Sequence, residues 1–310
     1  MTRRSEARLL VDLVEIPSPS GCEAAAARHL VDWCRERGMH SYIDAAGNAC
    51  AQWGEGPVSL CLLGHVDTVP GAVPVTLRGS ILTGRGTVDA KGPLAAFASA
   101  LARIAVSGRV PGSGSILLVG AVGEETDGSE GANHLLRRFE GCDPPAAVII
   151  GEPSRWDRIT LGYRGALRGR SVHRTETSHS GGPEPTAAEL AFAAWHNALE
   201  CARARNESRD PGLFWRLSPR LLRVDSASDG LTETAELQFG VRIPPGETVR
   251  GVREAFDRAL GGDNVFSGGE EPYLVERNSR VVRAWFGACS RPSARDGVAR
   301  DLPSRRAPRI

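Results

Sequence analysis

The chain has 310 residues and a formal net charge of +1 at pH 7, with 41% hydrophobic and 24% charged residues. This is an ordinary globular composition, and the length suffices for one large domain or two ordinary ones. No apolar stretch is long enough to cross a bilayer, and the N-terminal apolar run is broken by Asp12 and Glu15. We therefore expect neither a membrane span nor a signal peptide.

Seven cysteines form no CxxC pair and lie mostly in apolar or helical sequence. This pattern predicts reduced, buried thiols and a cytoplasmic protein. Residues 271–310 hold nine arginines against four acidic residues, a net charge of +5, which leaves −4 for residues 1–270. Nothing in this mildly acidic body indicates nucleic-acid binding.

The first 150 residues alternate predicted strands and helices. A helix, a breaker and a second helix are expected over 5–38, and strands over 41–54 and 58–65. After a Gly-rich loop we expect a helix over 93–108, a strand over 115–125, a helix over 130–139 and a strand over 146–154. Such alternation is typical of a layered α/β domain.

The pattern changes after residue 164. Strand-like segments at 166–175, 213–226, 234–245 and 264–269 are interrupted by helical patterns at 186–205 and 248–260. This order matches a split-βαβ, ferredoxin-like α+β sandwich. We expect it to be a second domain, inserted into the first at about 165–272.

Polar residues follow three of the buried apolar strands. His65 and Asp67, within GHVDTVPG, follow the first apolar run. Glu124 and Glu125 follow the second run and Glu152 follows the third, while Asp89 lies in the Gly-rich loop. Taken singly, each has a plain structural explanation, such as a satisfied core histidine, a helix cap or a solvated loop end. Converging carboxylates repel one another unless a cation or proton neutralises them, so a metal site explains the whole set with one cause.

The residue types indicate which metal and which chemistry. Histidine and carboxylate ligands without thiolates suit Zn²⁺, Co²⁺ or Mn²⁺. Two such ions bridged by one carboxylate can polarise a carbonyl and activate water. Glu124 and Glu125 are neighbours that point opposite ways on an extended chain, so one can bind metal while the other acts as a general base.

The motifs GHVDTVPG, GRGTVDAKG, GAVGEETDGSEG and IIGEPS, in this order and spacing, resemble those of the M20 metallopeptidases and deacylases. The resemblance implies a mixed-sheet catalytic domain of zinc-peptidase type, with an inserted lid and dimerisation domain. It also implies two Zn²⁺ per site, with Co²⁺ as an alternative. By resemblance, His65 and Glu152 hold the first metal, Asp89 bridges, Glu125 binds the second metal, Asp67 orients His65 and Glu124 is the general acid/base.

Two further residues follow from the resemblance. SHSGGPEP matches a motif whose histidine steadies the oxyanion in the partner's active site of a homodimer, which points to His179; a lone surface histidine is the alternative. GVRIPPGET resembles a segment whose arginine binds the substrate carboxylate, which would be Arg242.

Within the family, EIPSPSG and GEPSRWDRITLGYRG are most similar to hydrolases that release lysine or ornithine from an amino-group carrier protein in lysine and arginine biosynthesis. A small N-acyl amino acid is the alternative substrate, as for acetylornithine deacetylase or succinyl-diaminopimelate desuccinylase. A dipeptidase of the same family and a catalytically impaired remnant also stay open.

The C-terminal part departs from the family pattern, which places a second-metal histidine near the C-terminus. No histidine follows His196. We expect residues 1–164 and 273–288 to form the catalytic domain, and 289–310, in which 15 of 22 residues are Arg, Pro, Ser or Ala, to be a disordered tail. A frameshift is the favoured origin, and a basic binding tail or a naturally shortened enzyme are the alternatives. The hypothesis is one tightly held metal, a weaker second one and feeble hydrolysis.

Overall fold

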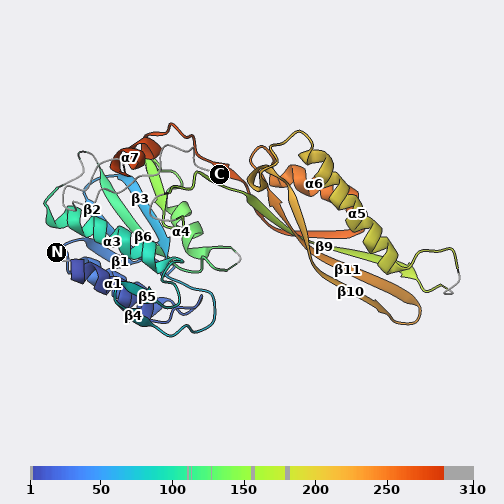
Figure 1. Ribbon diagram of the computed structural model, residues 1–310, viewed down its shortest axis with the longest axis horizontal. Helices are drawn as coiled ribbons and strands as arrows, with labels where there is room; N and C mark the ends of the chain where they lie inside the picture. Colours follow the sequence, from blue (N-terminus) through green and yellow to red (C-terminus); the bar gives the residue numbers. More distant parts are fainter. Residues whose placement is uncertain are drawn as a thin grey trace. The chain divides into compact units, whose positions relative to one another are not determined.

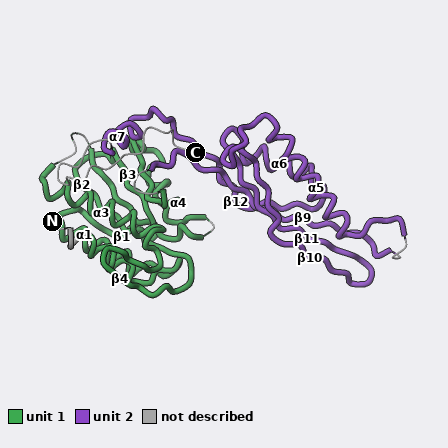
Figure 2. The backbone as a smooth tube through the Cα atoms, viewed as in Figure 1, with its two compact units in different colours: residues 1–155 green, residues 156–310 purple. Residues whose placement is uncertain are grey.

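The computed structural model describes residues 3–109, 112, 114–126, 128–154, 158–178 and 182–289. The chain divides into two compact units, residues 1–155 and 156–310 (Figure 2). At 310 residues a chain commonly divides its apolar side chains between two cores, and each unit has its own main cluster of buried residues.

Unit 1 is built on a five-stranded mixed sheet with the strand order β1-β2-β6-β3-β7 (Figure 1). β3 pairs in parallel with both β6 and β7, whereas β2 pairs antiparallel with β1 and β6. The strands are β1 (His40–Ile43), β2 (Ala49–Gly54), β3 (Val58–His65), β6 (Ser115–Ala121) and β7 (Ala147–Ile150). A hairpin of β4 (Thr76–Arg78) and β5 (Ile81–Thr83) lies outside this sheet.

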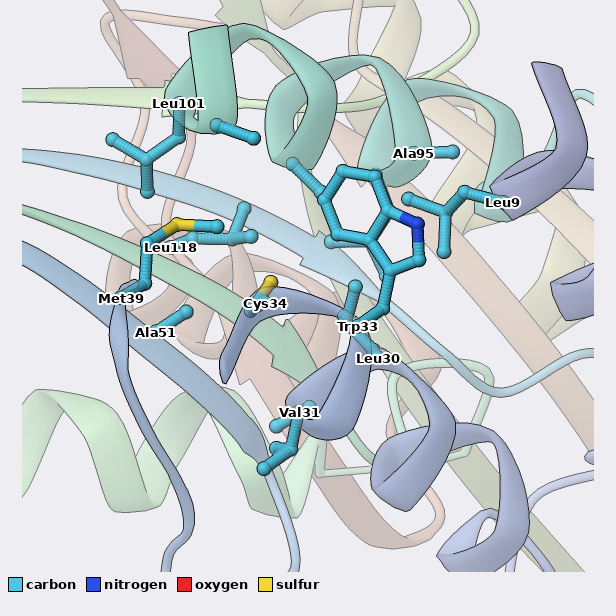
Figure 3. Packing of buried hydrophobic residues seen from close by; sticks show 14 of the residues in the cluster. Leu9, Leu30, Val31, Trp33, Cys34, Met39, Ala51, Ala95, Leu101 and Leu118 are labelled. Carbon is cyan, nitrogen blue, oxygen red and sulfur yellow. The ribbon is translucent and has the colours of Figure 1, made fainter. Parts of the chain in front are cut away.

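Helices cover both faces of the sheet because successive strand residues point to opposite sides. Leu62 and Leu118 pack into the core with α1 (Arg3–Glu15), α2 (Ala24–Arg35) and α3 (Lys91–Val106). Their neighbours Cys61 and Leu117 pack on the other side with α4 (Glu130–Arg138). Figure 3 shows Trp33, Leu101 and Leu118 within the first of these clusters.

Unit 2 contains a four-stranded antiparallel sheet with the order β10-β11-β9-β12. Alternate residues of β11, among them Leu237, Phe239 and Val241, are buried together with residues of the two helices α5 and α6. Phe239 lies so close to Gly169 that a Cβ there would be 2.3 Å from its ring. The elements are β9 (Gly165–Glu176), α5 (Ala187–Asn206), β10 (Ser218–Ser228), β11 (Thr232–Ile243), α6 (Val249–Leu260) and β12 (Asp263–Glu270).

The remaining elements of unit 2 are the short pair β8 (Gly162–Tyr163) and β13 (Tyr273–Leu274), a 3₁₀ turn at Leu213–Trp215 and α7 (Arg280–Cys289). The element order β-α-β-β-α-β matches the predicted sandwich. The predicted insertion of 165–272, with 273–288 belonging to the catalytic domain, stays a prediction. The predicted tail lies outside the described residues, apart from Cys289.

The prediction that most cysteines are buried is wrong. Cys34, Cys50 and Cys61 are buried, Cys201 is intermediate, and Cys22, Cys142 and Cys289 are exposed. All seven are free thiols. The exposed ones lie in loops or near a helix end, where the local composition says little about burial.

Candidate metal centre

His65 is the last residue of β3, and its side chain is only 1% exposed. Its Nδ1 atom lies 3.0 Å from the backbone oxygen of Asp67 and 3.2 Å from Asp67 Oδ1. Nε2 is 3.1 Å from Asp89 Oδ1 and 3.8 Å from both Glu124 Oε2 and Glu152 Oε1. Asp67 therefore orients the ring from one side, and the other ring nitrogen is left for the carboxylate cluster.

The carboxylates converge because of the sheet topology. β3, β6 and β7 are parallel, so their carboxyl ends share one edge of the sheet. Glu124 and Glu125 follow β6, and Glu152 follows β7. Asp89 lies just before α3. Residues separated by up to 87 positions thus meet around one imidazole.

Two overlapping groups can hold a metal ion. The ligand atoms of His65, Glu124 and Glu125 all lie within 4.8 Å of one another, and so do those of His65, Asp89 and Glu152. The second group matches the predicted first-metal set. The first group includes Glu124, the predicted general base, so its carboxylate is also close enough to His65 and Glu125 to be a metal ligand.

Asp67 and His65 stabilise each other as an ion pair. Burial alone would raise the pKa of Asp67, but hydrogen bonds from His65, the Glu125 amide and Ser20 outweigh it and lower the pKa to about 2. Burial alone would lower the pKa of His65, but the bond with Asp67 and the charges of Glu124 and Glu152 raise it to about 9.

Burial, together with mutual repulsion, raises the pKa values of the three glutamates of the cluster. Burial, reinforced by Glu124 and Asp89 against the charge of His65, raises the pKa of Glu152 to about 7. Burial likewise raises the pKa values of Glu124 and Glu125, and neighbouring carboxylates add to the effect. A divalent cation would relieve this repulsion, and one imidazole with several carboxylates suits Zn²⁺, Co²⁺ or Mn²⁺. The residues therefore fit the predicted metal.

Six of the eight predicted site residues meet in this cluster: His65, Asp67, Asp89, Glu124, Glu125 and Glu152. Their individual roles stay predictions. His179 lies outside the described residues. Arg242 is an exposed residue of β11 in unit 2, and its positive charge adds to burial in lowering the pKa of Arg164. Its role in substrate binding also stays a prediction.

Sequence reasoning missed Ser20, whose hydroxyl donates a 2.8 Å hydrogen bond to Asp67 Oδ2. The same oxygen accepts a 3.0 Å bond from the Glu125 amide, so Asp67 anchors both His65 and the Glu124–Glu125 turn. The one signal in the sequence is the polar loop SPSG between two predicted helices, and its composition indicates a helix breaker without indicating a partner for Ser20. Within the described part of the chain, no helix is both long and apolar enough to span a membrane.

Comparison with curated proteins finds similar enzymes. The chain is 36% identical over 282 residues to a protein of Deinococcus radiodurans named LysW-lysine hydrolase, covering 89% of this chain and 76% of that one. It is 33% identical over 296 residues to a Thermococcus kodakarensis protein named as a putative LysW-lysine/LysW-ornithine hydrolase, covering 95% and 76%.

Solved structures show the same fold at low identity. A metallo-carboxypeptidase of the M20 family from Sulfolobus solfataricus has a TM-score of 0.67 at 17% identity, covering 93% of this chain and 83% of that one. A tripeptidase from Staphylococcus aureus has a TM-score of 0.70 at 18% identity, covering 93% and 81%. These likenesses confirm the predicted mixed-sheet α/β fold. The model of peptidase family M20/M25/M40 matches residues 61–296, and the chain belongs to that family.

Proposed function

We propose that this chain hydrolyses the amide bond between lysine or ornithine and the amino-group carrier protein LysW, in lysine or arginine biosynthesis. The observation that carries the proposal is the 36% identity to a LysW-lysine hydrolase over 89% of the chain. The carboxylate–histidine cluster supports it, because amide hydrolysis at neutral pH needs an activated water and a polarised carbonyl.

The residues have separate tasks in this proposal. His65, Asp89 and Glu152 hold one Zn²⁺, and Asp89 and Glu125 contribute to a second site, with Co²⁺ as an alternative. When bound, the metals supply carbonyl polarisation and lower the pKa of water. Glu124, whose side chain is 42% exposed, accepts a proton from the attacking water on its carboxylate and donates it to the leaving amine nitrogen.

The setting of the reaction is part of the proposal. Seven free cysteines support a cytoplasmic location, where thiols stay reduced. β10 is an edge strand with exposed Leu222 and Val224, which supports a homodimer formed through unit 2. Arg242 binds the substrate carboxylate, and His179 steadies the oxyanion from the partner subunit.

Replacing Glu124 with glutamine tests the mechanism. The change removes the proton acceptor and keeps the size of the side chain. We expect turnover of LysW-linked lysine to fall by about 10²–10⁴-fold, while metal content, measured by mass spectrometry after dialysis, stays unchanged. Loss of metal together with activity would instead assign Glu124 as a ligand, and full activity would remove it from the mechanism.

The substrate class needs its own assay. Carrier-linked lysine, carrier-linked ornithine, N-acetylornithine, succinyl-diaminopimelate and a dipeptide are compared with wild-type protein and added Zn²⁺ or Co²⁺. We expect turnover of the carrier-linked amino acids and one metal held more tightly than the other. Preference for N-acetylornithine, succinyl-diaminopimelate or the dipeptide would overturn the substrate assignment. No turnover of any of them would favour the remnant.

A further inference from the structure

The segment Ile16–Glu23, between α1 and α2, contains no candidate metal ligand, yet it bonds to three loops around the metal centre. With the loop after β3 it forms an isolated parallel bridge, Pro19 to Thr68. Ser18 donates a 2.7 Å bond to the backbone oxygen of Val66, and Ser20 bonds to Asp67. The segment is therefore bonded directly to residues 66–68, which follow His65.

Glu23 connects the segment to the second loop. Its carboxylate is buried, at 7% exposure for the residue, and Oε1 accepts hydrogen bonds from the amides of Gly21 at 2.9 Å and Gly123 at 3.1 Å. Gly123 adopts a φ of +64°, a left-handed conformation, and immediately precedes Glu124. Glu23 thus fixes the point at which the chain turns into the Glu124–Glu125 pair.

Lys91 connects the third loop to the same region. It is the chain's single lysine, is 1% exposed, and lies two residues after Asp89. Its Nζ donates bonds of 2.9 Å to the backbone oxygen of Leu13 and 2.8 Å to that of Ile16. Both acceptors lie where α1 ends, where helix carbonyls lack partners within the helix. The Asp89 loop is therefore tied to the start of the segment.

We propose that Ile16–Glu23 is the positioning frame of the metal centre, with Glu23, Ser20 and Lys91 as positioning residues. Through these bonds the three side chains fix the positions of the Glu124–Glu125 turn, Asp67 and the Asp89 loop relative to one another. Separations of the order of 0.5 Å decide whether such a set binds metal productively, so the frame controls metal affinity without touching the ion. The link to catalysis rests on the proposed function, whereas the positioning itself does not.

The test compares Glu23→Ala and Glu23→Gln in the full chain, with Glu36→Ala as the matched control. Glu23 and Glu36 flank the two ends of α2, but the Glu36 side chain is 73% exposed, and among the described residues its ion-pair partner is Arg37. Hydrogen exchange of peptides covering 121–126 is measured without metal or substrate, and Co²⁺ affinity is measured by visible absorbance. Unfolding temperature and circular dichroism report whether each variant is folded.

We expect Glu23→Ala to lose exchange protection at 121–126 and to bind Co²⁺ about 10–100-fold more weakly while folded. Glu23→Gln retains an acceptor oxygen and should recover most of both properties, and Glu36→Ala should match wild type. Unchanged exchange and Co²⁺ affinity in folded Glu23→Ala would overturn the proposal, and so would equal losses in the glutamine variant.

Should Glu23→Ala fail to fold, Ser20→Ala is measured in the same way. It removes only the donor to Asp67, and we expect faster exchange of the Glu125 amide with about 10-fold weaker Co²⁺ binding. Wild-type behaviour of this variant would overturn the frame. Because exchange is measured without metal or substrate, an inactive wild-type chain would refute the proposed function and leave this result standing.

Discussion

At the scale of single residues, three thiols in the interior of unit 1 differ from those at the surface. Cys34 lies in α2, Cys50 in β2 and Cys61 in β3, and each is at most 1% exposed. Burial raises their pKa values to about 12, 12 and 11 respectively, because the thiolate loses its hydration. Since the thiolate is the nucleophile, burial suppresses reactivity through both access and protonation.

We therefore expect iodoacetamide at pH 8 to modify Cys22 and Cys142 and to spare the three buried thiols. Their thiolate fraction at this pH is on the order of one in 1,000 or less. Peptide mass spectrometry over a time course measures each site, and labelling in concentrated urea, where all seven should react, is the control. Modification of Cys61 as fast as that of Cys142 would contradict the packing of β3.

The residues that build the metal cluster differ in how far the sequence predicts them. His65, Glu124 and Glu152 could be predicted because each follows an apolar strand, and parallel strands share an edge. Ser20, Glu23 and Lys91 could not. Their bonds to Asp67, to Gly123 and to the backbone oxygens of Leu13 and Ile16 join residues 47 to 100 positions apart. Contacts of this kind leave no periodic pattern in the sequence.

At the scale of elements, the buried strands were the most predictable. β3 and β6 are apolar runs because both of their faces are covered. β7 was also expected to be buried, but Val148 and Ile150 on one of its faces are each 48% exposed. The hairpin β4–β5 could not be predicted, since its residues are largely exposed and carry no apolar–polar alternation. The insertion of β6 between β2 and β3 could not be predicted either, because strand order depends on pairing between segments and not on local pattern.

β9 carries a buried pair on its helix-covered face. Ser171 and His173 are 0% and 8% exposed, and Ser171 Oγ lies 3.0 Å from His173 Nε2. Burial lowers the pKa of His173, and the charge of Asp263 only partly opposes this. The unfolded chain therefore binds a proton at this residue more readily than the folded chain does.

It follows that the contribution of His173 to stability is complete above the ordinary pKa of histidine, near 6.5, and is lost as the pH falls through that value. We expect the urea midpoint of wild type to fall further between pH 7.5 and 5.5 than that of His173→Gln. The difference should be on the order of 1 kcal/mol in the free energy of unfolding. His196→Gln, on the exposed side of α5 at 63% exposure, should behave as wild type. Parallel pH dependence of all three proteins would contradict the buried neutral state.

At the scale of the whole molecule, the six clustered site residues all belong to unit 1, whereas Arg242 belongs to unit 2. Each unit has its own core, so the two can respond differently to the same ligand. A ligand that binds only the folded state stabilises the part that holds it, by about 2.7 kcal/mol at a concentration 100 times its Kd.

We therefore expect Zn²⁺ to slow hydrogen exchange in peptides from β3, β6 and β7 and to leave peptides from β9 and β11 unchanged. EDTA should reverse the effect, and Asp89→Asn should weaken it, since that carboxylate lies 3.1 Å from His65 Nε2. Equal protection in both units would show that the metal also binds or orders unit 2. Protection confined to unit 2 would place the metal away from the carboxylate cluster. His65 belongs to both candidate ligand groups. If Zn²⁺ slows hydrogen exchange only in unit 1, and this effect is lost in His65→Ala, the metal centre lies at the carboxyl ends of the three parallel strands.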